Sequence, residues 1–178
     1  MAKVTFCSYL VLCLILLSGC GGGTAGVVPL PIPENKGIVF SCTLNQGLTN
    51  TSIPIKAIEV SFVLPAAVSP VLNQDGSLLI GETGLKNLKT LNSQGNIPSG
   101  SYDPNTHKII FTLLPNDVAT SDLGVGDIAR LTYVTTAGVE LSSQEILNTL
   151  SYKVVGPGSV DLSSEIVPSV RIVTYQKP

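Results

Sequence analysis

The chain has 178 residues and a formal net charge of −2, from 10 lysines and arginines against 12 aspartates and glutamates. This balance excludes the strongly basic surface that nucleic-acid binding requires. The sequence has no tryptophan and one histidine, His107, so a histidine-ligated zinc site or a Ser-His-Asp triad is hard to build. The length accommodates one ordinary domain.

The N-terminal residues have the pattern of a secretory signal peptide. Lys3 is the only charged residue before Glu34, and a nearly continuous apolar segment runs from Val4 to Leu17. Its 14 residues are fewer than the ~20 apolar residues that a transmembrane helix needs. A positive residue followed by a short apolar segment is typical of a signal peptide, which we expect to occupy residues 1–19.

The motif Leu17-Ser18-Gly19-Cys20 ends this segment and resembles the lipobox of bacterial lipoproteins. In that family a thiol at a fixed position accepts a diacylglycerol, and small residues before it admit the signal peptidase. The resemblance implies cleavage between Gly19 and Cys20 and a covalent lipid on Cys20, with no other cofactor. An ordinary secretory signal and an uncleaved anchor are the alternatives.

The lipoprotein interpretation predicts a location in the bacterial cell envelope. Stable anchoring needs more than one acyl chain, and the family carries two or three. Gly21 follows Cys20, where an aspartate would signal retention in the inner membrane. We therefore expect the outer membrane if the source has two membranes. The mature chain would have 159 residues (178 − 19), with Cys42 as its one unmodified cysteine and no intramolecular disulfide.

Residues 20–36 are expected to form a tether and residues 37–178 a single β domain. Three glycines follow Cys20, and prolines occupy positions 29, 31 and 33. Such a segment fits neither a helix nor a central strand. Beyond it, apolar and polar residues alternate with a period of two, which predicts half-buried strands. The segments with this pattern are 38–44, 57–64, 108–113, 129–134 and 170–172.

This alternation also assigns the buried side chains. Phe40, Phe62 and Phe111 fall on inward positions, and Cys42 shares the phase of Phe40, which favours a small buried side chain over a reactive thiol. Turn signals at 45–47, 73–76, 103–105, 115–117 and 156–158 separate the segments. A capping box from Ser142 to Glu145 predicts one short helix. The sequence therefore predicts an all-β, antiparallel sandwich.

The order of segments from Lys56 to Thr136 is similar to that of cohesin-like domains. A strand ends in Leu64-Pro65-Ala66, a Tyr102-Asp103-Pro104 turn precedes the next strand, and Gly124-Val125-Gly126-Asp127 leads into Ile128-Ala129-Arg130-Leu131-Thr132-Tyr133. The resemblance implies a jelly-roll sandwich, a fold shared with several carbohydrate-binding modules. Cohesins bind dockerin modules through a flat sheet face, so the resemblance also implies a protein partner, with no individual contact residue transferred.

Residues with the chemistry for catalysis or metal binding are scattered. His107 follows the 103–105 turn, where a solvated residue at the strand edge is the simpler interpretation. Asp117, Asp122 and Asp127 recur every five residues, and oxygen ligands from one loop can hold calcium, although such residues more often start turns. No glycine loop precedes a helix to cradle phosphate. We expect a non-catalytic protein without a metal.

Sugar binding is the alternative function. Sugars stack on exposed aromatic rings, and Tyr102, Tyr152 and Tyr175 are the candidates, with packing at the core or its rim as the simpler interpretation of each. The leading hypothesis is a lipid-anchored envelope protein that presents a cohesin-like sandwich for protein–protein interaction or surface assembly. The alternative is a carbohydrate-binding module at the cell surface.

We predict that Cys20→Ala abolishes metabolic labelling with palmitate and leaves an unprocessed precursor, because both lipidation and cleavage depend on the thiol. Labelling followed by gel analysis of the membrane fraction measures both effects. Label retained by the Cys20→Ala protein would refute the lipoprotein interpretation.

Overall fold

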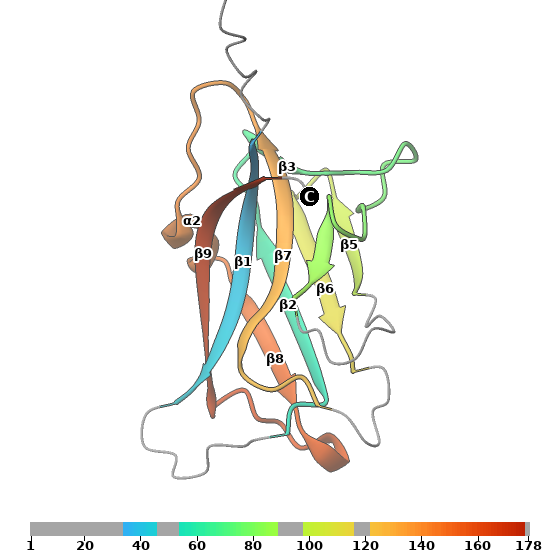
Figure 1. The fold of residues 1–178 in the computed structure, drawn as a ribbon, viewed down its shortest axis with the longest axis vertical. Helices are drawn as coiled ribbons and strands as arrows, with labels where there is room; N and C mark the ends of the chain where they lie inside the picture. The colour runs from blue at the N-terminus through green and yellow to red at the C-terminus, as the bar shows by residue number, and fades with distance from the viewer. Residues whose placement is uncertain (1–33, 46–53, 89–97, 116–121, 177–178) are drawn as a thin grey trace, which may run out of the picture. The chain divides into compact units, whose positions relative to one another are not determined.

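A computed structural model describes residues 34–45, 54–88, 98–115 and 122–176, which form two antiparallel β-sheets (Figure 1). Sheet A has five strands, in the order β3 (Val68–Pro70), β7 (Gly126–Thr135), β1 (Glu34–Leu44) and β9 (Ile166–Gln176), with β4 (Leu85–Asn87) also paired to β7. Sheet B has four strands, in the order β5 (Ser99–Asp103), β6 (Lys108–Leu113), β2 (Ala57–Val63) and β8 (Ser151–Val155). The predicted all-β class with antiparallel sheets is confirmed.

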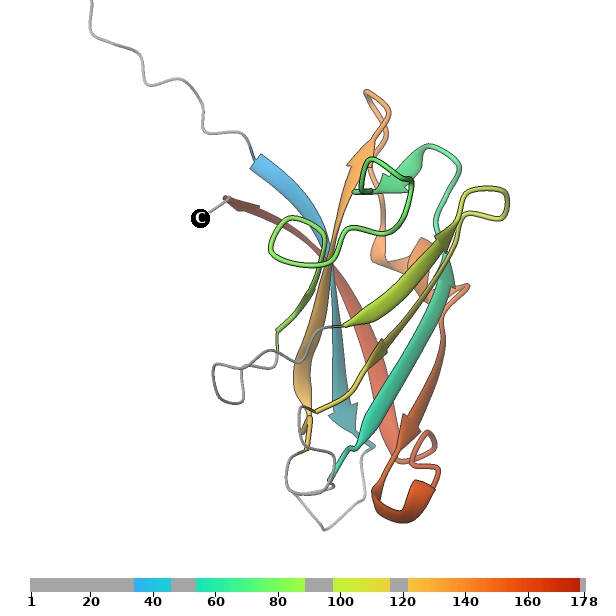
Figure 2. The same ribbon diagram turned by 90° about the vertical axis from the view of Figure 1, so that its right-hand side faces the viewer.

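The two sheets face each other across a shared hydrophobic core (Figure 2). Strands β2 and β6 of sheet B follow the predicted alternation, since Ile58, Val60 and Phe62 are buried and the residues between them are not. Cys42 is also buried in this core, as predicted, at 3% exposed. One face of each sheet therefore lines the core, and the opposite face is left outside it.

Three phenylalanines connect the sheets at the centre of the core. The ring centroid of Phe40 on β1 lies 5.0 Å from that of Phe62 on β2 and 5.2 Å from that of Phe111 on β6. These separations and the tilted and edge-on ring orientations are the arrangements that aromatic pairs prefer. All three rings are at most 2% exposed, so the inward phase predicted for them is confirmed.

Several strand boundaries differ from the prediction. β1 begins at Glu34, so residues 34–36, assigned to the tether, belong to sheet A, where Lys36 pairs with Tyr133 and with Thr174. β9 spans 11 residues rather than the three predicted, because Pro168 and Ser169 within it obscure the alternation. The strands that the pattern did not reveal have three to five residues each, which is too short for a visible period: β3, β4, β5 and β8.

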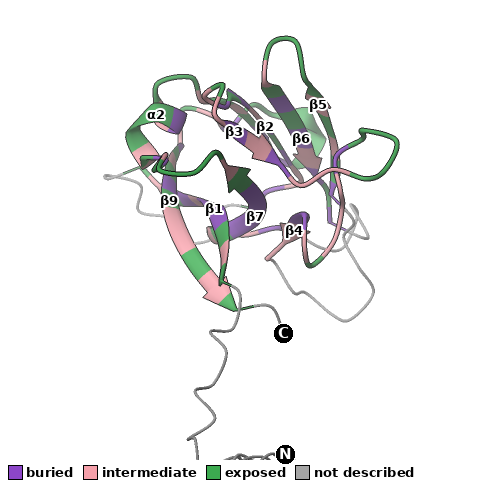
Figure 3. Cartoon of the chain, turned by 90° about the horizontal axis from the view of Figure 1, so that it is seen from above, coloured by how far each residue is buried: buried purple, intermediate pink, exposed green. Residues whose placement is uncertain are grey.

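A short helix and tight turns connect the strands as the sequence predicts. In α2 (Ser143–Leu147), Ser142 and Glu145 form the predicted capping box, and Ile146 is fully buried against the core. The helix lies against β9 and β2 at one side of the sandwich (Figure 3). The 156–158 turn is the start of a 3₁₀ helix, η1 (Pro157–Ser159). The 73–76 and 103–105 turns are also present. Those at 45–47 and 115–117 fall largely outside the described residues.

The predicted signal peptide, the lipobox with Cys20 and residues 20–33 of the tether also lie outside the described residues. Among the residues that the structure does describe, no helix has the length and apolar character needed to cross a membrane. The predicted anchor therefore stays a prediction.

We predict that Phe111→Ala lowers the free energy of unfolding by about 3–5 kcal/mol, because it removes a buried ring and leaves a cavity between the sheets. Chemical denaturation followed by circular dichroism measures the change. The neighbouring Ile110→Thr is the matched control: its side chain is 38% exposed on the outer face, and its effect should stay within about 0.5 kcal/mol. Equal losses from both variants would contradict the assignment of the core.

Candidate functional site

The predicted calcium ligands do not form a site in the described residues. Asp127 lies on β7, where Ser41 Oγ donates a hydrogen bond of 2.6 Å to Oδ1 and Arg171 forms an ion pair with Oδ2. Asp122 precedes β7, and Asp117 lies outside the described residues. No group of three metal-ligating side chains occurs in the described part of the chain. The five-residue spacing predicts that the three aspartates share one loop. However, β7 begins at Gly126, so Asp127 lies on the strand, where its carboxylate contacts Ser41 and Arg171.

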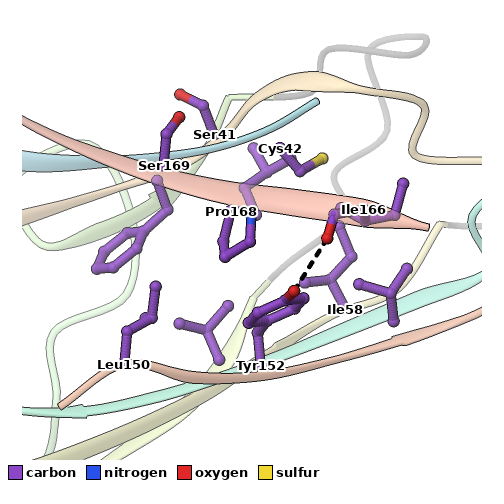
Figure 4. A pocket seen from close by; sticks show the side chains of 12 residues that line it. Ser41, Cys42, Ile58, Leu150, Tyr152, Ile166, Pro168 and Ser169 are labelled. Atoms are coloured by element: carbon purple, nitrogen blue, oxygen red, sulfur yellow. Dashed lines mark hydrogen bonds between the residues drawn. The ribbon is translucent and has the colours of Figure 1, made fainter. Parts of the chain in front are cut away.

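Two of the three candidate tyrosines pack against the core. The Tyr152 hydroxyl donates to the carbonyl oxygens of Ser163 and Ile166, at 3.1 and 2.9 Å (Figure 4). The Tyr102 hydroxyl lies 3.1 Å from Nδ1 of His107, at the shoulder of the β5–β6 hairpin. Both rings border the core cluster, so packing at the core rim, the simpler interpretation, describes them. His107 is half-buried in this pair rather than solvated at the strand edge.

The cavity beside Tyr152 is too small for a ligand. It is bounded by residues from both sheets, among them Cys42, Tyr152 and Pro168 (Figure 4). The space open to the centre of a water molecule is about 20 Å³. A single water needs roughly 10–15 Å³ on this measure, so the cavity holds about one water and no substrate.

The third tyrosine belongs to a cluster on the outer face of sheet A. The guanidinium carbon of Arg130 lies 3.7 Å from the centroid of the Tyr175 ring, a cation–π contact. The Tyr175 hydroxyl hydrogen-bonds with Thr132, and Thr132 Oγ1 also donates to the carbonyl oxygen of Gly84. Gly37 leaves the space for this packing, since a Cβ there would lie 3.0 Å from Tyr175 Cε1 and 3.1 Å from Arg130 Cγ. Tyr175 is therefore a structural cross-strand contact.

Charged side chains cover another part of this outer face, which also exposes Val134 and Val167. Arg130 donates to the carbonyl oxygen of Glu82, and the Glu82 carboxylate lies near both Arg130 and Lys86. Val39 lies in register between Arg130 and Arg171 and is only 3% exposed, although it points away from the core. The polar groups of sheet A thus largely contact one another. This explains why Val39 and Thr132 break the predicted alternation.

The outer face of sheet B is different in character. Its side chains form two cross-strand rows in register: Ser99, Thr112, Glu59 and Lys153, then Ser101, Ile110, Ser61 and Ser151. We call these eight residues the sheet B face. Most of them are short, so the surface is flat, and Ile110 lies among the serines with 38% of its area exposed. Val63, 37% exposed, extends the apolar centre along β2.

The hydroxyl groups of the sheet B face are available to a partner. Among the described residues, none of the hydroxyls of Ser61, Ser101, Thr112 and Ser151 hydrogen-bonds to another side chain or to the backbone. At the rim, Thr106 and the Asn105 amide donate to Asp103, and these bonds lower the pKa of its carboxyl group. The hairpin edge of the face is therefore held in place while its centre stays unengaged.

The sheet B face is the candidate functional site. It offers hydroxyl donors and acceptors around an apolar centre, with charges of both signs at its ends, and it has no nucleophile paired with a base. The sequence shows Glu59, Ser61, Ile110 and Thr112 as polar-phase positions of two predicted strands, whereas the other four residues lie on β5 and β8, which the pattern did not reveal. It gives no signal that this sheet, rather than sheet A, keeps an open outer face.

Comparison of the chain with protein-family models, with curated proteins and with solved structures finds no match in any of the three. The function is therefore argued from the geometry of the chain itself.

We predict that Gly37→Ala and Tyr175→Ala are energetically coupled. Without the ring, an alanine at position 37 should stabilise the strand by roughly 0.5–1 kcal/mol, because it restricts the unfolded chain. With the ring present, the Cβ crowds Tyr175 and Arg130, and the gain should vanish or reverse. A double-mutant cycle measured by urea unfolding should give a coupling of at least about 0.5 kcal/mol. Additive effects would show that Tyr175 does not pack on Gly37.

Proposed function

We propose that this protein is a non-catalytic envelope protein, anchored through a lipid on Cys20, that binds a protein partner with the sheet B face. The observation that carries the proposal is the contrast between the two outer faces. The polar and aromatic side chains on the outer face of sheet A largely contact one another, whereas the sheet B face presents unengaged serine and threonine hydroxyls around Ile110. A flat surface with an apolar centre and a polar rim has the composition of a protein–protein interface.

The charges at the rim favour a folded protein as the occupant. Glu59 and Lys153 are cross-strand neighbours at one end, and Asp103 and Lys108 pair in register at the other. Because each end of the face carries one acidic and one basic side chain, a partner with complementary charges would bind in one preferred orientation. The binding energy itself would come from the apolar centre, since residues at the middle of an interface dominate affinity.

The strand order supports the jelly-roll and cohesin-like part of the proposal. Among the described strands, β5 and β6 are the only consecutive pair that hydrogen-bond to each other, and most connections cross from one sheet to the other. Such crossing connections are typical of Greek-key and jelly-roll sandwiches. Cohesins use a flat sheet face, and the sheet B face has that character.

The lipobox and the tether support the location in the envelope, at the outer membrane if the source has two membranes. Gly21 after Cys20 favours that membrane, and the glycine- and proline-rich residues up to position 33 provide reach before β1 begins at Glu34. A sandwich held in this way can contact another envelope protein while its lipid stays inserted in the membrane.

Carbohydrate binding, the alternative proposed from the sequence, has less support. It needs a ring with a free face, and Tyr102 and Tyr152 border the core while Tyr175 is stacked by Arg130. The sheet B face has no aromatic side chain. A glycan would have to bind through hydroxyls and Ile110 alone.

We predict that a photo-crosslinking amino acid at position 101 captures a discrete envelope protein in living cells, and that Ile110→Asp abolishes the adduct. A buried carboxylate at the centre of the interface would be desolvated without a partner, which is strongly unfavourable. Immunoblotting of the full-length chain after irradiation measures the adduct.

Val167→Asp is the matched control, because Val167 is also exposed, at 44%, but lies on the outer face of sheet A. This variant should retain the adduct. An adduct that survives Ile110→Asp, or one that is lost equally in both variants, would refute the sheet B face as the interface. Binding of the purified protein to a glycan array would favour the alternative.

A further inference from the structure

A second site lies at the end of the sandwich where β1 begins. A pocket of about 200 Å³ is lined by Lys36, Tyr133, Thr174 and Ile172 from sheet A and by Glu140 and Leu141 from the loop after β7. In Figure 2 the first residues of β1 and the last of β9 lean away from sheet B at this end. The pocket is separate from the sheet B face, because its sheet residues lie on the opposite sheet.

Strand register sets the floor of the pocket. Lys36 pairs with Tyr133 on one side and with Thr174 on the other, so three polar side chains form one cross-strand row. The next row inward is apolar, with Ile38 between Leu131 and Ile172. Polar groups therefore line the mouth, and Ile172 and Leu141 provide apolar walls.

The Tyr133 side chain is almost fully buried, but its hydroxyl reaches the surface of the pocket, where it has no partner from the described residues. The residue is 3% exposed, yet among the described residues its hydroxyl makes no hydrogen bond. Burial raises the pKa of this phenol, and the charge of Glu140, which lines the same pocket, raises it further. This hydroxyl is therefore available to hydrogen-bond with water or with a ligand in the pocket.

The pocket also presents two opposite charges that are not paired with each other. The Lys36 ammonium and the Glu140 carboxylate form no ion pair with any residue that the structure describes. The Tyr133 and Thr174 hydroxyls can donate beside Lys36. One region thus favours an anion, and the other, at Glu140, favours a cation.

We propose that this pocket binds a small zwitterion with the chemistry of a free α-amino acid. Its carboxylate would accept from Lys36, Tyr133 and Thr174, and its ammonium group would donate to Glu140. A short apolar side chain would pack between Leu141 and Ile172. The volume supports a ligand of this size, because sites for larger organic ligands enclose about 300–1,000 Å³.

NMR titration of the ¹⁵N-labelled full chain in detergent with L-valine tests the proposal. We expect saturable shifts of the amides of Lys36, Tyr133 and Leu141, with a Kd of about 1 mM, as ligand efficiency permits for a molecule this small. N-acetyl-L-valine lacks the cation and L-valinamide lacks the anion. Each should bind about tenfold or more weakly, since each loses a charge-assisted contact.

Variants of the pocket complete the test. Tyr133→Phe removes only the unpartnered hydroxyl, and Glu140→Gln only the charge, and each should weaken L-valine binding about tenfold. Tyr102→Phe and Glu165→Gln make the same chemical changes outside the pocket and should leave binding unchanged. Equal binding of N-acetyl-L-valine would overturn the proposal in favour of a simple anion site, and so would the absence of any saturable shift. Neither result would bear on the sheet B face.

Discussion

The contact on which the fold depends is the cross-sheet packing of Phe40 against Phe62 and Phe111. Each sheet has one apolar face, so neither is stable alone, and burial of the two inner faces against each other supplies the hydrophobic stabilisation. The rings hold β1 over β2 and β6, the central strands of the two sheets. This contact also sets which face of each sheet points away from the core.

The two outer faces follow from different uses of the same strand geometry. On sheet A, glycine at position 37 admits the Tyr175 ring, and Arg130 stacks on it, so long side chains fold flat and contact one another. On sheet B, the serine and threonine hydroxyls lie beside neighbours with which they form no hydrogen bond among the described residues, so they stay unengaged. The outer face of sheet B is therefore the one proposed for docking, and the proposed lipid anchor would hold it close to other envelope proteins.

The end of the sandwich differs from its middle because sheet A continues beyond the apolar core. The row of Tyr133, Lys36 and Thr174 occupies core-facing positions but lies past the last apolar row. Lys36 and Thr174 are exposed there and line one pocket with the Tyr133 hydroxyl, and the absence of partners for these groups among the described residues is the reason for proposing a ligand. The proposed docking at sheet B and the proposed small-molecule binding at this end use different surfaces of the described residues.

Local pattern in the sequence was enough for the central strands, the inward phenylalanines, the buried Cys42 and the capping box of α2, because each depends on neighbours within a few residues. The lipobox is likewise a local signal. Only the tertiary structure decided the rest. Asp127 joined Ser41 and Arg171 from other strands, and Tyr175 met Arg130 across the sheet, because strand pairing brings together residues far apart in the chain. Which outer face stays open, and where Tyr133 meets Glu140, depends on register and loop path, and no periodicity encodes either.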